Sequence, residues 1–156
     1  MNDGHDCGSG RALYGWSPAR LPADTPGKRL IDRILPASGA PVTLYYAAVI
    51  ALLMLAPYLP KRAELAVDGL AALAAAAWCC ANFWRCRHAH CGVTGTGWFA
   101  LATFTFVEVG IGHSVIGGYE QPAFLGILLT GLAFEAYWYL TRGTNAVTRQ
   151  RRPGAT

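Results

Sequence analysis

Long apolar stretches alternate with short polar connections over the last two thirds of the chain. Each stretch is close to the roughly 20 residues that an α-helix needs to cross about 30 Å of hydrocarbon. Proline, glycine or charged residues interrupt the pattern where helices are expected to end. The pattern predicts an all-α fold, an integral membrane bundle of four transmembrane helices, with spans at residues 42–59, 64–83, 97–117 and 122–140.

Individual residues refine this prediction. Pro57 is expected to kink or close the last turn of the first helix. The alanine block 74–77 allows close approach of neighbouring backbones, so the second helix is expected to be central. Pro122 suits the first turn of the fourth helix. This helix ends with aromatic residues 137–139 and Arg142, which are typical of the boundary between a membrane and water.

The polar ends of the chain differ from this apolar middle. Residues 1–40 are rich in Gly, Pro, Ala and charge, a composition that predicts a disordered tail. Within it, residues 28–35 have the periodicity of a short helix on an anionic membrane surface, and a solvated linker is the alternative. The predicted division is therefore a tail (1–40), a four-helix transmembrane domain (41–142) and a basic tail (143–156).

Composition supports a membrane location and argues against nucleic acid as a partner. Hydrophobic residues make up 53% of the chain and charged residues only 14%, compared with roughly 25% charged residues in soluble domains. The net charge of +4 comes from basic residues that flank the apolar stretches and form no single basic surface. The expected partner is the lipid bilayer.

The basic residues also predict an orientation. Four spans would place both tails and the connection between the second and third spans on one side of the membrane. Of the 13 Lys and Arg residues, only Lys61 and Arg62 fall on the other side. The positive-inside rule therefore predicts a multi-pass protein of a prokaryotic inner (plasma) membrane with cytoplasmic N and C termini. Thiols on the cytoplasmic side are expected to be reduced.

The segment between the second and third spans carries the densest group of metal-binding side chains. It offers two thiols and two imidazoles, enough for a tetrahedral zinc-like ion, or two sulfurs for a softer ion. Thiol redox chemistry and a loop without ligands are the alternatives. The four residues are Cys86, His88, His90 and Cys91.

A vicinal thiol pair, Cys79 and Cys80, lies near the end of the second span. Adjacent residues point about 100° apart on a helix, so the two thiols cannot face one axis equally. Cysteine is also common as a small buried apolar residue. We consider ion binding and simple burial as equal alternatives for this pair.

Four ionisable residues fall inside or at the edge of the predicted spans. A charge in the hydrocarbon costs several kcal/mol, so such residues usually face the bundle interior or a path for protons or ions. Glu108 is expected at mid-span, where this cost is greatest, and Glu135 is expected to pair with Arg142 or with basic residues of the Cys/His segment. The intramembrane set is Asp68, Glu108, His113 and Glu135.

The Cys/His segment resembles a conserved-looking loop in a group of small, largely uncharacterised prokaryotic membrane proteins, which reads Asn-x-x-Arg-Cys-Gly-Arg-x-His-Cys-x-x-Thr-Gly-Pro. The chain departs from that pattern at Arg87, His88 and Thr96. Its layout, with a cysteine pair in a helix and cysteines in a cytoplasmic loop, is also similar to small mercury-transport membrane proteins. The matching residues are Asn82, Arg85, Cys86, His90, Cys91, Thr94 and Gly95.

Together, the residues and these resemblances favour transport or trafficking of a thiophilic metal ion across the inner membrane, with Hg²⁺, Cu⁺ and Zn²⁺ as candidate ions. No enzymatic activity is expected under this hypothesis. A membrane thiol–disulfide oxidoreductase that passes electrons to quinone is the first alternative. An accessory subunit of a larger membrane complex, or a homo-oligomer, is the second.

Overall fold

The computed structural model describes residues 40–143, together with residues 30 and 147. These residues form an all-α fold of four α-helices and one 3-10 turn. The tails predicted from the sequence, and the short helix expected at residues 28–35 apart from Leu30, lie outside the described residues. The elements are α2 (Ala40–Leu55), η1 (Ala56–Tyr58), α3 (Lys61–Cys86), α4 (Ala89–Ile111) and α5 (Glu120–Arg142).

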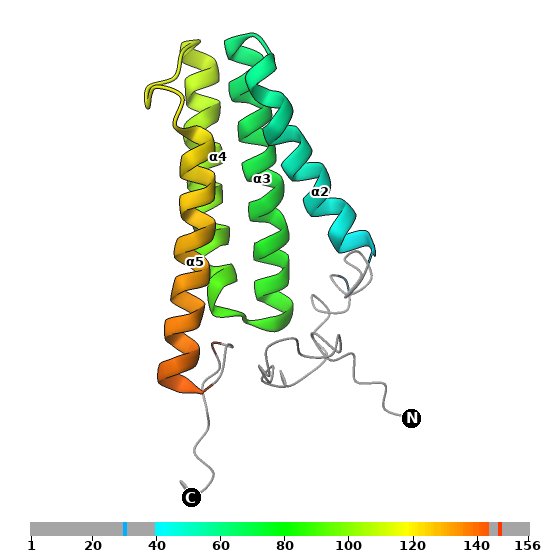
Figure 1. The fold of residues 1–156 in the computed structure, drawn as a ribbon, viewed down its shortest axis with the longest axis vertical. Coiled ribbons are helices and arrows are strands. Elements are labelled where there is room, and N and C mark those ends of the chain that lie inside the picture. Colours follow the sequence, from blue (N-terminus) through cyan, green and yellow to red (C-terminus); the bar gives the residue numbers. More distant parts are fainter. Residues whose placement is uncertain (1–29, 31–39, 144–146, 148–156) are drawn as a thin grey trace, which may run out of the picture.

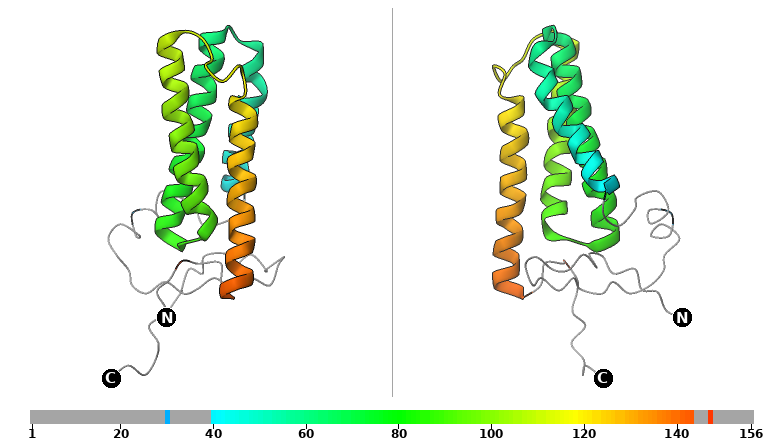
Figure 2. Two further views of the ribbon diagram at one scale, coloured as in Figure 1. Left: turned by 90° about the vertical axis from the view of Figure 1, so that its left-hand side faces the viewer. Right: turned by 45° about the vertical axis from the view of Figure 1, so that its right-hand side comes forward.

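Successive helices run antiparallel, so the α3–α4 turn lies at the same end of the bundle as the start of α2 and the end of α5 (Figure 1). The most extensive contact joins α3 and α4, while α2 packs mainly on α3 and α5 mainly on α4. Figure 2 shows α2 inclined across α3, with α5 standing along the other side of the bundle. The alanine-rich helix is central, as its composition predicts, because α3 contacts all three other helices.

The connection between α3 and α4 is much shorter than the sequence pattern predicts. Arg87 adopts the left-handed conformation (φ 54°) and ends α3, and its backbone N–H donates to the carbonyl of Phe83. His88 is extended, and α4 then begins at Ala89, eight residues before the predicted start of the third span. The prediction of a Cys/His loop is therefore wrong, since His90 and Cys91 belong to the first turn of a helix.

Glycines in the first half of α4 explain why the sequence suggested a loop. A glycine inside a helix costs about 1 kcal/mol relative to alanine. Here the missing side chains permit close helix packing. A Cβ atom on Gly95 would lie 3.2 Å from Cys80 Sγ, and one on Gly97 would lie 2.7 Å from Ile127 Cγ2. Packing against α3 and α5 therefore stabilises a helix that local preference disfavours.

Two helical segments within the described residues are long and apolar enough to cross a membrane, namely Lys61–Trp84 and Glu120–Arg142. The apolar helix Thr43–Tyr58 is shorter. It includes the 3-10 turn Ala56–Tyr58, in which Pro57 lies. The expected closure of the first helix at Pro57 is confirmed.

The burial of acidic residues and the exposure of large apolar ones both differ from what is usual in water-soluble proteins. Acidic residues are almost never buried in soluble domains unless they are paired. None of the five acidic residues within 40–143 is exposed, and four of them are buried. Large apolar side chains instead cover the outside, as expected for a surface in contact with lipid. Examples are Leu44, Ile50, Met54, Leu70, Phe99, Val107, Leu129 and Leu140.

The close approach of α4 and α5 gives a test of the fold. A Cβ atom on Gly131 would overlap Cγ2 of Thr94, a buried residue of α4. We expect Gly131→Ala to force the two helices apart and to lower the free energy of unfolding by about 1–3 kcal/mol. Thermal unfolding in a mild detergent provides the measurement.

Gly126 is the matched control on the same helix. It is exposed, and a Cβ atom there would meet nothing within 4 Å. Gly126→Ala should therefore leave stability unchanged or increase it by up to about 1 kcal/mol, because alanine favours the helix. Equal effects of the two substitutions would contradict the described packing of α4 on α5.

Candidate metal centre at the turn between α3 and α4

Two histidines beside the α3–α4 turn converge on a carboxylate from α5. His88 Nδ1 lies 3.3 Å from Glu135 Oε1, and His90 Nδ1 makes a short contact with Glu135 Oε2. Both imidazoles are partly exposed, whereas Glu135 is buried. One ligand atom from each of the three residues can be chosen so that all lie within 4.8 Å of one another. This spacing allows all three to contact a single ion.

The short turn explains the convergence. His88 precedes α4 in an extended conformation and His90 lies in its first turn, so both reach the flank of α4 that faces α5. Glu135 is one helical turn beyond Gly131, where α5 comes closest to Thr94 and to the backbone of His90. Because Gly131 has no side chain, α5 packs closely on α4, and the carboxylate of Glu135 lies within reach of both histidines.

A pair of thiols lies immediately behind the histidines, in the core between α3 and α4. Cys79 and Cys91 are both free and buried, and they lie in the same core cluster. Thr94 donates its hydroxyl to Cys79 Sγ at 3.3 Å, and Asn82 donates its amide to Cys91 Sγ at 3.4 Å. Buried sulfur atoms are therefore held in place by side chains from both helices.

His90 joins the two groups of ligands. Its Nδ1 contacts Glu135, while its Nε2 lies 3.1 Å from Cys91 Sγ. A carboxylate on one ring nitrogen fixes the orientation of the imidazole, as the outer partners of metal-bound histidines commonly do. The result is a continuous set of oxygen, nitrogen and sulfur atoms from α3, α4 and α5.

The structure brings together part of the predicted metal-binding set. His88, His90 and Cys91 lie in one region, and Cys79, which the sequence places in a separate vicinal pair, lies there as well. Cys80 is exposed, and its sulfur lies beside Gly95. The vicinal pair is thus divided between the core and the surface, as the 100° offset of neighbouring helical residues requires. The side chain of Cys86 is outside the described part of the chain.

Glu135 was expected on an intramembrane ion path and is instead the acidic member of this cluster. Its described ion-pair partners are the two histidines, whereas the guanidinium of Arg142 lies over the ring of Trp138 at 5.1 Å. The position of Glu135 in the sequence could have indicated this contact. In an antiparallel bundle, the end of α5 lies at the same end as the α3–α4 connection, so an acid in the second half of α5 lies near that connection.

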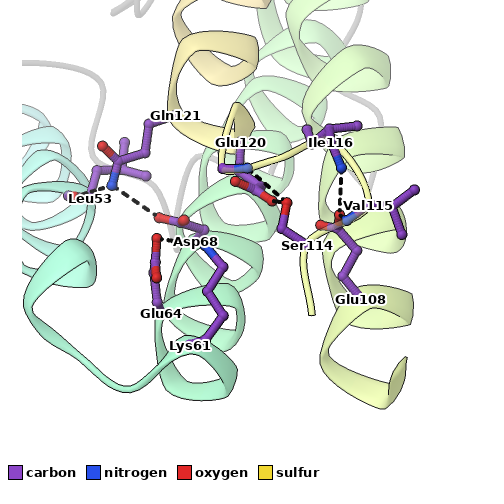
Figure 3. A network of polar contacts seen from close by, with 11 residues as sticks. Leu53, Lys61, Glu64, Asp68, Glu108, Ser114, Val115, Ile116, Glu120 and Gln121 are labelled. Carbon is purple, nitrogen blue, oxygen red and sulfur yellow. Dashed lines mark hydrogen bonds and ion pairs between the residues drawn. The ribbon is translucent and has the colours of Figure 1, made fainter. Parts of the chain in front are cut away.

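The other intramembrane candidates lie at the opposite end of the bundle (Figure 3). Asp68 and Glu108 are buried, as expected. Glu108 is not at mid-span, however, because α4 ends at Ile111, well before the predicted end at residue 117, and Glu108 therefore lies in the last helical turn. His113 is exposed in the α4–α5 connection, two residues beyond the end of α4.

Known proteins provide no further guide to this site. No protein-family model, curated protein or solved structure matches the chain. Its interpretation therefore depends on the geometry described above.

Replacing Glu135 tests the cluster independently of any metal. Glu135→Gln removes the charge that both imidazoles contact, while it keeps the size of the side chain. We expect a loss of about 1–3 kcal/mol in the free energy of unfolding, because buried polar groups lose a strong acceptor. Chemical or thermal unfolding of metal-free protein in detergent measures this loss.

The matched control is Glu64→Gln. Glu64 forms a partly exposed ion pair with Lys61 at 3.0 Å, and such pairs contribute about 0–1 kcal/mol. An effect of Glu64→Gln as large as that of Glu135→Gln would show that the Glu135–histidine contacts do not stabilise the fold.

Proposed function

We propose that this protein is an integral membrane protein with four spanning helices that binds and moves a thiophilic transition-metal ion. The membrane placement is supported by the exposed apolar side chains, the buried acids and the two helices of sufficient length. In this arrangement α2 and α4 cross the bilayer with α3 and α5. The α3–α4 turn and both termini face the cytoplasm of a prokaryotic inner membrane.

The observation that carries the metal proposal is the convergence of His88, His90 and Glu135. Two imidazoles and one carboxylate are ligands that suit Zn²⁺ and other borderline divalent ions. The thiols of Cys79 and Cys91 add the soft ligands that Cu⁺ and Hg²⁺ prefer. The ion is cargo in this proposal, so Zn²⁺, Cu⁺ and Hg²⁺ all remain candidates.

The geometry supports movement of the ion by ligand exchange. Cys79 and Cys91 are buried, whereas His88 and His90 are partly exposed. An ion bound by the thiols can pass to the histidines through His90, whose Nε2 lies 3.1 Å from Cys91 Sγ. Each step replaces one protein ligand by another, so the ion is never left without ligands in the bundle. Ligands on the cytoplasmic side would then remove it.

One observation favours a second candidate, a membrane thiol–disulfide oxidoreductase. Cys79 and Cys91 come from different helices and lie in the same buried core cluster. Oxidation of these two thiols to a disulfide would pass two electrons to a quinone and release two protons. The histidines and Glu135 would then position the thiols and exchange those protons.

Topology is the first test. A reporter fused after Gln150 should report a cytoplasmic location, and a reporter inserted between Leu59 and Glu64 should report the opposite side. Paired alkaline phosphatase and fluorescent-protein fusions measure both positions. The reverse pattern would place the histidine cluster in an oxidising compartment and would overturn the proposed orientation.

Metal binding is the second test. Protein purified in mild detergent under reducing conditions should bind about one Zn²⁺ ion per chain, measured by mass spectrometry of the metal and by titration. His90→Ala should weaken Zn²⁺ binding by about tenfold or more, since loss of even an outer partner of a metal ligand costs 10–100-fold. The joint replacement Cys79→Ser and Cys91→Ser should weaken Cu⁺ or Hg²⁺ binding more than Zn²⁺ binding.

His113→Ala and Cys80→Ser are the matched controls, because both residues are exposed and neither lies in the cluster. Both variants should bind metal as the unmodified protein does. Unchanged binding in His90→Ala would remove the cluster from the proposal. Quinone reduction by metal-free protein, abolished by Cys91→Ser, would favour the oxidoreductase.

A further inference from the structure

A second polar region lies at the end of the bundle opposite the histidine cluster. We call it the acidic pocket and define it by Asp68, Glu108, Ser114, Glu120 and Gln121. Its three carboxyl groups come from α3, α4 and the first residue of α5, and they are at most 4% exposed. Figure 3 shows Asp68 between Gln121 and Glu120, with Ser114 between Glu120 and Glu108.

Two of the three carboxyl groups have partners that stabilise an anion. Glu108 accepts hydrogen bonds at Oε1 from the backbone N–H groups of Val115 and Ile116. Glu120 accepts a short hydrogen bond from the hydroxyl of Ser114, and it begins α5, where the helix dipole favours negative charge. Donors directed at a carboxylate favour its ionised form.

Asp68 lacks comparable partners. Its Oδ1 accepts one long hydrogen bond, at 3.5 Å, from the amide of Gln121, and this amide also donates to the carbonyl of Leu53 at 2.7 Å. The other oxygen, Oδ2, is buried without any hydrogen-bond partner. An ionised carboxylate in this state would be costly, because a single long hydrogen bond compensates little of its charge. Oε2 of Glu108 is also buried without a hydrogen-bond partner. Because Oε1 of Glu108 accepts two backbone hydrogen bonds while Asp68 accepts only one long one, Asp68 has the greatest tendency of the three acids to bind a proton.

The surrounding charges do not remove that tendency. Lys61 forms its ion pair with Glu64 and acts on Asp68 and Glu120 only at longer range. The other titratable residues near this end are all exposed, namely Tyr58, Arg62, His113 and Tyr119. Four acidic groups, Glu64 and the three acids of the pocket, therefore share a single partly buried ammonium group.

We propose that the acidic pocket is a proton-binding site in which Asp68 carries the proton at neutral pH and exchanges it with water at that end of the bundle. This inference rests on the proposed membrane placement but not on metal binding. In a transporter, a proton released from Asp68 would leave a negative charge on the side where a cation enters. Proton release and cation entry would thus be coupled at the end opposite the histidine cluster.

Infrared spectroscopy of the full chain in lipid vesicles tests the proposal without any metal. A protonated carboxyl group gives a C=O band that is separate from the carboxylate bands and shifts in D₂O. The unmodified protein should show this band at neutral pH and lose it as the pH is raised. Asp68→Asn should lack the band, whereas the control Glu64→Gln should keep it.

Further variants distinguish loss of the protonated carboxyl group from loss of the folded structure. Glu108→Gln should keep the band, because the proton is assigned to Asp68. Asp68→Glu should retain a band at a shifted frequency, and circular dichroism establishes that each variant is folded. Absence of the band from the unmodified protein at neutral pH would overturn the proposal. Its persistence in folded Asp68→Asn would do the same, because the proton would then belong to another acid.

Discussion

The two-residue turn between α3 and α4 determines how the ligand groups of the candidate metal centre meet. Arg87 in the left-handed conformation and extended His88 reverse the chain, so α4 starts beside the end of α3. This register places Cys91 in the same buried core cluster as Cys79 and directs both histidines toward α5. At its other end α4 stops at Ile111, which places Glu108 in the last helical turn. The candidate metal centre thus depends on one connection, and the acidic pocket depends on the point where α4 ends.

A second constraint is the burial of acidic groups beneath an apolar exterior. Buried carboxyl groups are held by imidazoles, a serine hydroxyl, backbone amides or a glutamine, while leucine, valine and phenylalanine cover the outside. In water this arrangement would forgo burial of apolar area, which is the main stabilising contribution to soluble folds. In the proposed lipid environment the outer surface would cost nothing, and interior hydrogen bonds together with close packing of small residues would hold the helices together. The alanines of α3 and the glycines of α4 and α5 serve that packing.

The polar groups are concentrated at the two ends of the bundle. One end holds nitrogen, oxygen and sulfur ligands on three helices, and the other holds oxygen groups alone. Between them, the core contains alanines and the stacked rings of Trp98 and Phe124. A soft or borderline cation suits the first end, and a proton suits the second. This separation of chemistry is the physical basis of the proposed coupling between cation and proton movement.

The sequence by itself determined the all-α class, the four apolar segments, the closure at Pro57 and the central place of α3, because these depend on composition and local pattern. It also identified His88, His90, Cys91 and Cys79 as candidate ligands from their chemistry. It placed the third helix eight residues too late, because Gly92, Gly95 and Gly97 are unfavourable in an isolated helix. Only the tertiary structure decided that these glycines pack against α3 and α5, so that α4 begins at Ala89. The structure also decided that Glu135 meets the histidines and that Cys80 faces outward, because contacts between residues distant in sequence depend on helix register rather than on local pattern.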